Sequence, residues 1–495
     1  MKYLYGAAVQ GIQSFIFQTN ELLDIIGASE LVNKICDEEF KKFENDGTIV
    51  VKAAGNIKYV FNNRSDCEKA VRFFPKQIME KAPGITISQA VVKMDGEFAG
   101  FDKAVNKLEE RLKIQRNRPI RPLNLGLIAT ERCDKTCLPA VAIGKKNGFV
   151  DAATKAKKEE GKDIDTKGKL CEKAFGHYDE GKKFPSDISK ITGRNDWIAI
   201  IHADGNGLGK VIQKVGENQE KLSEFSQGLD EATTSAAQKA YCSIKSRYGI
   251  EQEKTIPIRP VVIGGDDFTV ICRADFAVDY AAAYCKAFEE QTNKKVGHIL
   301  QDVGLDDHLT ACAGIALIKS SYPFYYGYNL AEELCSAAKK DAKTLNEDLA
   351  PSCLMFHKVQ DSFVVDYNDI TKRELTTADG TSWKYGPYYV DTQENRWTVL
   401  DLFNQVRMLD GEKNGNAVKS AIREWMTAMH NQPEYAKQLL QRAKEIYDNT
   451  EKEALKDATT ARVVKLKTGE TIHAYPAYDI LSLHTVITQE TKEKK

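Results

Sequence analysis

The order of apolar runs and turns between residues 197 and 345 restricts the folds open to this chain more than any other feature of its sequence. Apolar residues recur with helical spacing in some segments and form short continuous or β-branched runs in others. The predicted elements are, in order, a strand at 197–204, a helix at about 220–248, a hairpin at 261–272, a helix at 274–291, a strand at 308–320 and a helix at 329–345. This β-α-β-β-α-β-α order is that of the ferredoxin-like fold.

The N-terminal part of the chain repeats the same order. It predicts a strand at 3–10, a helix at 27–43, a hairpin at 48–61, a helix at 65–81, a strand at 85–94 and a helix at 101–115. Two copies of one unit place the chain in the α+β class, as two tandem ferredoxin-like domains followed by a mostly helical C-terminal domain.

Changes in composition mark the boundaries of these units. A polar stretch rich in Lys and Gly, with the character of a solvated loop or a mobile insertion, separates the two copies, and helical patterns dominate the C-terminal part. We therefore expect a first domain at 1–117, an insertion or linker at 118–195, a second domain at 196–345 and a helical domain at 346–495.

The composition excludes several classes of function. A net charge of −1 gives no general attraction to nucleic acid or to an anionic membrane, so a polyanion site would have to be a local patch. The N-terminus is too polar for a signal peptide, and no apolar run is long enough to span a membrane. The eleven cysteines are scattered and odd in number, which favours reduced thiols in a cytoplasmic protein.

The strongest chemical signal is the hairpin VVIGGDDFTVIC, because its turn carries Asp266 and Asp267. Gly and Asp are ordinary turn residues, so a simple turn is the alternative interpretation. In a ferredoxin-like sheet, however, the first strand lies beside the central hairpin, so Asp204 would face both acids. Three crowded carboxylates repel one another unless a cation lies between them. Oxygen ligands favour Mg²⁺ or Mn²⁺, and a two-metal site of this kind catalyses nucleotidyl transfer.

A Gly-rich loop, DGNGLGK at 204–210, follows the first strand of the second copy. Backbone N–H groups of such a loop, at the start of a helix, can bind a triphosphate. Gly264 and Gly265 would let the backbone approach a nucleotide without a Cβ clash. Lysines on this loop and on the last helix of the copy could add positive charge, although most lysines are simply solvated.

These motifs together resemble the palm domain of the CRISPR type III large subunit (the Cas-ten, or Cmr-two, family). The resemblance rests on ADGNGLGK, on the GGDD hairpin and on TACAGIALIKSSYPFYYGYNLAEELCSAAK. Near the N-terminus, GIQSFIFQTNELLDIIGASELV resembles the first palm of the same family, so the resemblance covers about residues 1–345. Family members carry two palms that face each other, and the GGDD copy polymerises ATP into cyclic oligoadenylate messengers.

The resemblance implies roles for individual residues. Catalysis would depend on Asp204, Asp266 and Asp267. The implied metal-binding residues are Asp204, Gly205, Asp266 and Asp267, and the implied nucleotide-binding residues are Gly264, Gly265, Asn206, Gly207, Gly209, Lys210, Lys339 and Lys340. The expected substrate is an NTP, in the first place ATP, and the expected cofactor is Mg²⁺ or Mn²⁺ in a two-metal site.

The sequence departs from the family pattern at several points. In the first copy the hairpin turn reads AAGN (53–56), and Ala8 stands where many relatives carry an acid, so we interpret this copy as a nucleotide-binding or structural partner without metal ligands. Asn206 replaces a second acid found in much of the family. The sequence contains no His-Asp dipeptide and starts directly at the first palm, so we expect no HD nuclease domain and no DNase activity.

CDKTC (133–137) lies where relatives often carry a zinc-binding cysteine group. The remaining candidate ligands, Cys171 and His177, lie far along the chain, and the spacing is poor for a four-ligand site. We therefore expect reduced structural cysteines rather than zinc. We interpret the aromatic segment SYPFYYGY (321–328) as a packed corner between a strand and a helix, with base stacking as the alternative.

Three functions stay open on the sequence alone. The leading hypothesis is a metal-dependent nucleotidyltransferase that makes cyclic oligonucleotide second messengers from NTPs in antiviral defence. The alternative is a catalytically weak palm scaffold within an RNA-guided CRISPR type III effector complex, with effector subunits and guide or target RNA as partners. The third is a stand-alone palm cyclase. None of the three involves a membrane, and a homodimer is compatible with each.

Overall fold

The structure of this protein is a computed structural model. It describes residues 1–53, 55–118, 129–144, 148–163, 168–179, 181–192, 196–360, 366–377, 380–409, 415–446, 449–465 and 471–487. Ala54 in the predicted AAGN turn, several short stretches of the predicted insertion and the Lys-rich end of the chain lie outside these ranges.

The first palm is built on a four-stranded sheet in the order β2-β3-β1-β4, with antiparallel neighbours throughout. Its elements are β1 (Lys2–Gln10), α1 (Ile12–Ile16), α2 (Leu22–Lys34), β2 (Thr48–Ala53), β3 (Asn56–Phe61), α3 (Arg64–Lys81), β4 (Thr86–Met94) and α4 (Phe101–Arg116). The helix predicted at 27–43 therefore begins earlier and ends at Lys34, where a π turn and a 3₁₀ turn continue the chain.

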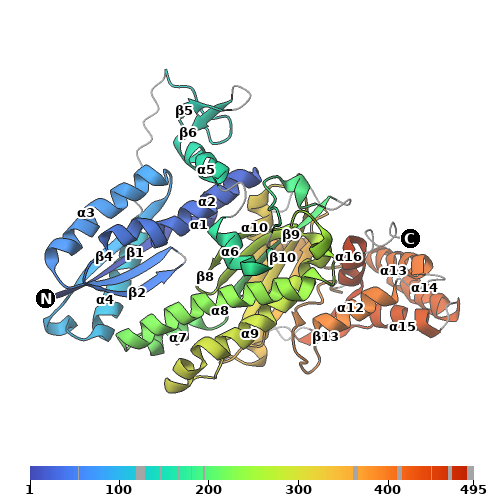
Figure 1. Ribbon diagram of the computed structural model, residues 1–495. Helices are drawn as coiled ribbons and strands as arrows, with labels where there is room; N and C mark the ends of the chain where they lie inside the picture. Colours follow the sequence, from blue (N-terminus) through green and yellow to red (C-terminus); the bar gives the residue numbers. More distant parts are fainter. Residues whose placement is uncertain are drawn as a thin grey trace.

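The second palm repeats this arrangement. Its elements are β7 (Trp197–Gly205), α7 (Leu208–Val215), α8 (Gln219–Lys245), β8 (Ile258–Gly264), β9 (Asp267–Arg273), α9 (Ala277–Asp302), β10 (Ala311–Lys319) and α10 (Phe324–Leu345). The strand order β10-β7-β9-β8 is the counterpart of β4-β1-β3-β2 in the first palm. The α+β class with two tandem ferredoxin-like units is thus confirmed, and the two sheets lie in the left and central parts of Figure 1.

Two further strands extend the second sheet beyond β10. They are β11 (Cys353–Lys358) and β12 (Tyr388–Tyr389), and β11 runs parallel to β10. β11 is almost completely buried, as expected for a parallel strand that is covered on both faces. Residues that we expected to form part of a separate helical domain therefore belong to the palm sheet.

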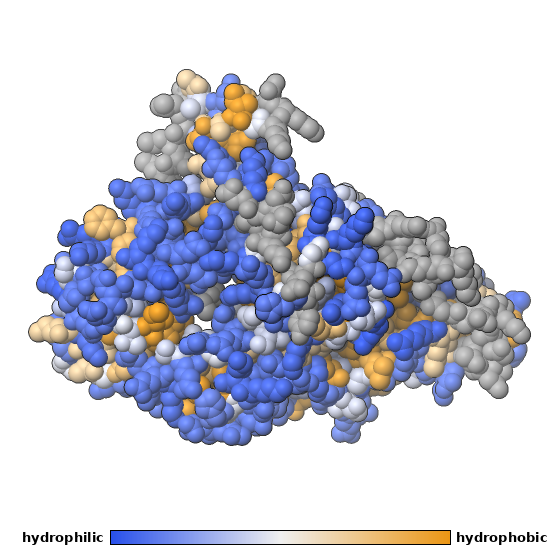
Figure 2. Space-filling model, viewed as in Figure 1, coloured by the Kyte–Doolittle hydropathy of each residue, from blue (hydrophilic) through white to orange (hydrophobic). Residues whose placement is uncertain are grey.

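The segment between the palms contains more regular structure than a solvated loop. It forms β5 (Ala140–Ile143), β6 (Phe149–Asp151), α5 (Ala152–Asp163) and α6 (Lys169–Phe175). A Cβ atom on Gly27 of α2 would lie 1.9 Å from the Lys157 carbonyl oxygen of α5, so these helices approach to backbone distance. The β5–β6 ribbon stands at the top of Figures 1 and 2, where Val141 and Ile143 expose 57% and 72% of their surfaces.

The remaining elements form the helical region at the right of Figure 1. They are α11 (Tyr367–Arg373), α12 (Val399–Met408), α13 (Gly415–Asn431), α14 (Pro433–Ile446), α15 (Asn449–Ala458), β13 (Arg462–Lys465), β14 (Thr471–Ala474) and α16 (Ala477–Ile487). Trp383 and Trp425 meet edge to face in its core, with ring centroids 5.4 Å apart. Among the described residues, no helix combines the length and the apolar character that a membrane span requires.

Contacts from the first palm fix the start of α10, which begins five residues before the predicted helix. The Asn20 side chain accepts a hydrogen bond from the Phe324 backbone N–H at 3.0 Å, and so caps the helix from the other palm. Phe17 stacks on Tyr328 with ring centroids 4.5 Å apart. Phe324 and Tyr328 are both buried and form the packed corner expected from the sequence, whereas Tyr325 and Tyr326 of the same segment are exposed.

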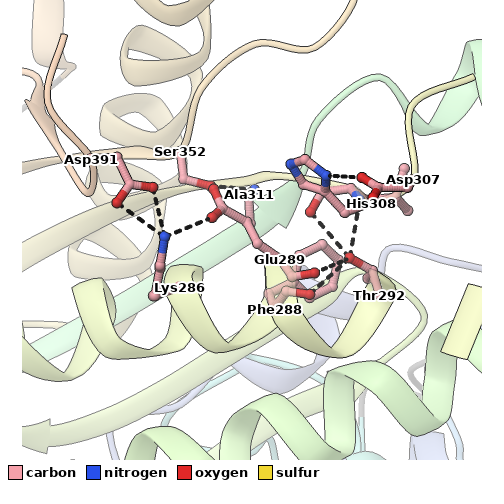
Figure 3. A network of polar contacts seen from close by, with 10 residues as sticks. Lys286, Phe288, Glu289, Thr292, Asp307, His308, Ala311, Ser352 and Asp391 are labelled. Carbon is pink, nitrogen blue, oxygen red and sulfur yellow. Dashed lines mark hydrogen bonds and ion pairs between the residues drawn. The ribbon is translucent and has the colours of Figure 1, made fainter. Parts of the chain in front are cut away.

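Helix α9 anchors the segment that leads into β10. The Thr292 hydroxyl accepts a hydrogen bond from the Leu309 backbone N–H at 3.0 Å, and the Ala311 N–H donates to the Ser352 hydroxyl at 3.1 Å (Figure 3). Lys286, also on α9, pairs with Asp391 at 2.7 Å. These contacts connect α9 to Leu309 before β10 and to Asp391 after β12, and they connect β10 to the residue that precedes β11.

We predict that Gly314→Ala destabilises the second palm. A Cβ atom at this position of β10 would lie 1.9 Å from the Ala331 carbonyl oxygen of α10, so the helix would have to move away from the sheet. Overpacking of this kind costs roughly 3 kcal/mol of unfolding free energy. The measurement is chemical denaturation, with Gly209→Ala as the control, because a Cβ atom at Gly209 meets nothing within 4 Å. Equal midpoints for both variants would contradict the tight packing of α10 on β10.

Candidate active site

Three carboxylates converge where β7 ends and the β8–β9 hairpin turns. Ala203 of β7 pairs with Phe268 of β9, so Asp204 follows on β7 beside the turn that carries Asp266 and Asp267. One oxygen of each carboxylate lies within 4.8 Å of the others, and all three side chains are half-buried. The structure therefore brings the three predicted acids together.

Glycines make this close approach possible. A Cβ atom on Gly205 would lie 3.0 Å from the Asp266 Cβ atom. Gly265 has φ +62°, in the left-handed region, where other residues are strained. The turn sequence is therefore required by the geometry of the hairpin as well as by its chemistry.

The electrostatics of the site favour a bound cation. Burial, followed by the charges of Asp204 and Asp267, raises the pKa of Asp266 to about 8. Burial and then Asp204 raise the pKa of Asp267 to about 7. Near neutral pH these carboxyl groups therefore hold protons unless a cation replaces them.

Lys339 of α10 supplies a positive charge beside the three acids. Its ammonium group contacts the Asp204 carboxylate and donates a hydrogen bond to the Gly205 carbonyl oxygen at 2.8 Å. Burial acts to lower the pKa of Lys339, but the charge of Asp204, its hydrogen bond to Lys339 and the nearby Cys335 and Cys312 together outweigh burial, so the pKa is raised and the amine stays charged. Lys339 therefore holds Asp204 in place and reaches the centre of the site.

The donor set fits Mg²⁺ or Mn²⁺. Both ions bind oxygen ligands and accept a small number of carboxylates together with phosphate oxygens. Within the described residues, these three acids form the one group of at least three His, Cys, Asp or Glu side chains with ligand atoms this close. The residues that would hold the ion are Asp204, Asp266 and Asp267. The carbonyl oxygen of Gly205, also predicted as a metal ligand, instead accepts a hydrogen bond from Lys339.

The Gly-rich loop and α10 line an open pocket next to the carboxylates. Its lining includes Asp204 to Lys210, Asp266, Lys343, Glu347 and Asp348. Gly207 has φ +71° and stands at the start of α7. The loop therefore has the expected place between a strand and a helix, beside the acids.

Three predicted nucleotide-binding residues have other contacts in the structure. The Asn206 amide group is buried and donates to the Thr310 hydroxyl at 3.0 Å and to the Ala350 carbonyl oxygen at 3.2 Å. Lys210 is exposed and lies 3.5 Å from Asp348. Lys340 is exposed and lies on a different side of α10 from Lys339. It lies near Lys384, because burial and then the charge of Lys340 act to lower the pKa of Lys384.

Cavities between the two palms lie on both sides of the hairpin. One has a cavity volume of about 80 Å³ and is lined by Gly264 and Asp267 of the second palm and by residues of the first palm that include Gln13, Ser29 and Asn33. The other has a cavity volume of about 330 Å³, and Gly265 and Asp266 line it together with residues of the first palm that include Ala7. The first palm therefore supplies walls to the site without acids at the positions of the triad.

Two charged residues on the helix that carries Lys339 were not predicted from the sequence. Burial and then the charge of Asp204 raise the pKa of Glu332, which indicates that Glu332 lies near the three acids. Lys343 lines the pocket beside the Gly-rich loop. The spacing of 332, 339 and 343 places them on one face of a helix, and this was the available signal.

Cys133 and Cys137 form a turn in which the Cys137 N–H donates to the Cys133 carbonyl oxygen at 2.9 Å. Cys133 and Cys171 are buried, whereas Cys137 is exposed. Among the described residues these cysteines belong to no group of three ligand atoms within 4.8 Å.

Comparisons with known proteins agree with this geometry. Residues 197–347 match the family model described as Cas10/Cmr2, second palm domain. No curated protein matches the chain. Among solved structures, the chain resembles one in the Csm1–Csm4 cassette in complex with cA4, with a TM-score of 0.57 and 13% identity, covering 98% of this chain and 69% of that one. The cassette with one ATP gives a TM-score of 0.56 at 16% identity, with the same coverage.

The match to a Csm1–Csm4 subcomplex of the type III-A CRISPR-Csm interference complex has a TM-score of 0.51 at 14% identity, again over 98% of this chain and 69% of that one. At these identities the likeness concerns the fold, while the family match covers the domain that holds the three acids. Both agree with the resemblance found in the sequence. Residues 197–347 therefore match the second palm domain of the Cas10/Cmr2 family, and the chain as a whole shares its fold with a chain of the solved Csm1–Csm4 structures.

Proposed function

We propose that this protein is a metal-dependent nucleotidyltransferase that joins NTPs, ATP in the first place, into cyclic oligonucleotide messengers of antiviral defence. The observation that carries the proposal is the convergence of Asp204, Asp266 and Asp267 in a Cas10/Cmr2 second palm domain. The structures that share its fold were solved with cA4 and with ATP, and this supports the choice of substrate class.

The residues of the chain have distinct tasks in this reaction. The three acids would hold the cations, and bound Mg²⁺ or Mn²⁺ would activate the attacking hydroxyl and neutralise the leaving pyrophosphate. Backbone N–H groups of the loop at 205–210 would bind the triphosphate at the start of α7. Lys339 orients Asp204 and adds positive charge where negative charge accumulates.

The first palm would provide the opposite wall for a second nucleotide. The cavities on both sides of the hairpin contain residues of both palms, so two nucleotides could meet at the three acids. Inter-palm contacts hold this arrangement: the Ser29 hydroxyl donates to the Val261 carbonyl oxygen at 2.5 Å, and Ser223 donates to Ile49 at 3.0 Å.

A second candidate function is that of a scaffold subunit in a type III effector complex. The Asn206 side chain is directed into contacts with Thr310 and Ala350, so a family acid is replaced by a structural amide. The solved structures of similar fold contain Csm4 as a partner, and a Csm4-like subunit together with guide or target RNA would be the partners here. Incubation with each NTP and Mg²⁺ or Mn²⁺, with and without target RNA, separates the two functions by product analysis.

We predict that replacing both Asp266 and Asp267 by Ala abolishes product formation and leaves the fold intact. The variant removes two of the three carboxylates that would hold the cations. Liquid chromatography with mass spectrometry measures the product, and circular dichroism reports the fold. The matched control is Asp306→Ala with Asp307→Ala, an exposed pair of aspartates in a loop of the same palm. Turnover in the Asp266/Asp267 variant would remove the site assignment.

The raised pKa values predict how the stability of the chelator-treated protein depends on pH. The folded state binds protons at Asp266 and Asp267 more tightly than the unfolded chain, whose aspartates titrate near pH 4. This contribution to stability is fully present below about pH 4 and is lost as the pH rises through about 7 to 8. Scanning calorimetry should therefore show a lower melting temperature at pH 9 than at pH 6.

Two controls accompany this measurement. The Asp266→Asn, Asp267→Asn variant should lose most of the decrease between pH 6 and 9, and excess Mg²⁺ should raise the melting temperature of the wild-type protein at pH 8. The same decrease in the wild-type protein and in the variant would show that other groups cause the pH dependence.

A further inference from the structure

Two side chains of α8 contact the backbone of the GGDD turn. The Thr233 hydroxyl donates to the Gly265 carbonyl oxygen at 2.5 Å. The Asp230 carboxylate accepts from the Gly265 N–H at 3.3 Å. Because the two residues are three positions apart, they lie on the same face of α8 and hold both polar groups of a single glycine.

Asp230 is itself fixed by a residue outside the palm. Lys173 of α6 pairs with the Asp230 carboxylate at 3.2 Å, and the Lys173 carbonyl oxygen accepts from the Gln238 side chain at 3.0 Å. The segment between the palms therefore connects to the turn through Asp230.

The turn needs this support for a physical reason. Gly265 has φ +62° and no side chain, so by itself it restricts the hairpin weakly. The ligand oxygens of Asp266 and Asp267 lie within 4.8 Å of that of Asp204, so the ionised forms that bind a cation repel one another and favour opening of the turn. On the far side of the acids, Phe268 stacks on Tyr284 of α9 with ring centroids 3.9 Å apart, so the strand is anchored while the turn depends on α8.

We propose that Thr233 and Asp230 are positioning residues that hold the GGDD turn so that its two carboxylates meet Asp204 at metal-binding distance. The proposal deepens the proposed function and rests on it. Neither residue belongs to the three-acid group, and both act through the Gly265 backbone.

The test compares Thr233→Val, Thr233→Ser and Thr234→Val. Valine has nearly the shape of threonine but no hydroxyl, serine keeps the hydroxyl, and Thr234 is the half-buried neighbour on α8 that serves as the matched control. Mn²⁺ binding is measured by electron paramagnetic resonance without any nucleotide. Loss of an interaction that orients metal ligands weakens metal binding roughly 10- to 100-fold, so we expect about a 10-fold loss for Thr233→Val, recovery for Thr233→Ser and no change for Thr234→Val.

A second measurement needs neither metal nor activity. Hydrogen exchange followed by mass spectrometry should show faster exchange over residues 261–268 in Thr233→Val and in Asp230→Ala than in the wild-type protein, while exchange in α9 and β10 stays the same. Wild-type Mn²⁺ affinity in Thr233→Val would overturn the proposal, and so would wild-type exchange over residues 261–268. A uniform increase in exchange over the whole palm would also overturn it, because it would indicate a general loss of stability.

The Asp266→Ala, Asp267→Ala variant separates this proposal from the proposed function. If that variant binds Mn²⁺ like the wild-type protein, the metal-site assignment itself is wrong. If it loses Mn²⁺ while Thr233→Val does not, the metal site stands and the role of α8 is refuted.

Discussion

The mutual repulsion of three carboxylates is the interaction on which the rest of this structure depends. Asp204 ends a buried strand and Asp266 and Asp267 occupy a tight turn, so the backbone leaves them little freedom to separate. The raised pKa values of Asp266 and Asp267 indicate that the charged forms of these two carboxyl groups are unfavourable without compensation. A bound cation, as we propose, would provide this compensation, and the contacts around the cluster hold the three acids together.

Residues of α8, of α10 and of the first palm hold the three acids in place. Lys339 on α10 holds Asp204, and α8 holds the turn through the Gly265 backbone. The first palm in turn fixes α10, because Asn20 caps its first turn and Phe17 stacks on Tyr328. The two palms are therefore coupled through the helix that carries Lys339, in addition to the cavities they share.

The sequence predicted the parts of this structure that depend on local pattern. Alternating and helical periodicities identified both ferredoxin-like units, and the strand order then placed Asp204 beside the GGDD turn. Contacts between segments that lie far apart in the chain could not be predicted from the sequence. The start of α10 is set by Asn20 of the other palm, and β11 joins the sheet although it follows the last predicted helix of the palm.

The same distinction applies to individual site residues. Residue type and motif spacing identified the acids and the glycines. They could not show that the Asn206 amide donates hydrogen bonds to Thr310 and Ala350, or that Lys340 lies near Lys384 instead of the acids. Neither α8 side chain belongs to a motif, since Asp230 and Thr233 gain their role only from the packing of α8 against the hairpin.

The most direct test of the central claim is a crystal structure with Mn²⁺ and a non-hydrolysable ATP analogue, with the metal located by its anomalous scattering. The account predicts an anomalous peak within bonding distance of Asp204, Asp266 and Asp267, with the triphosphate along the loop at 205–210. A triphosphate bound elsewhere, or no metal at the three acids while Lys339 stays on Asp204, would contradict it.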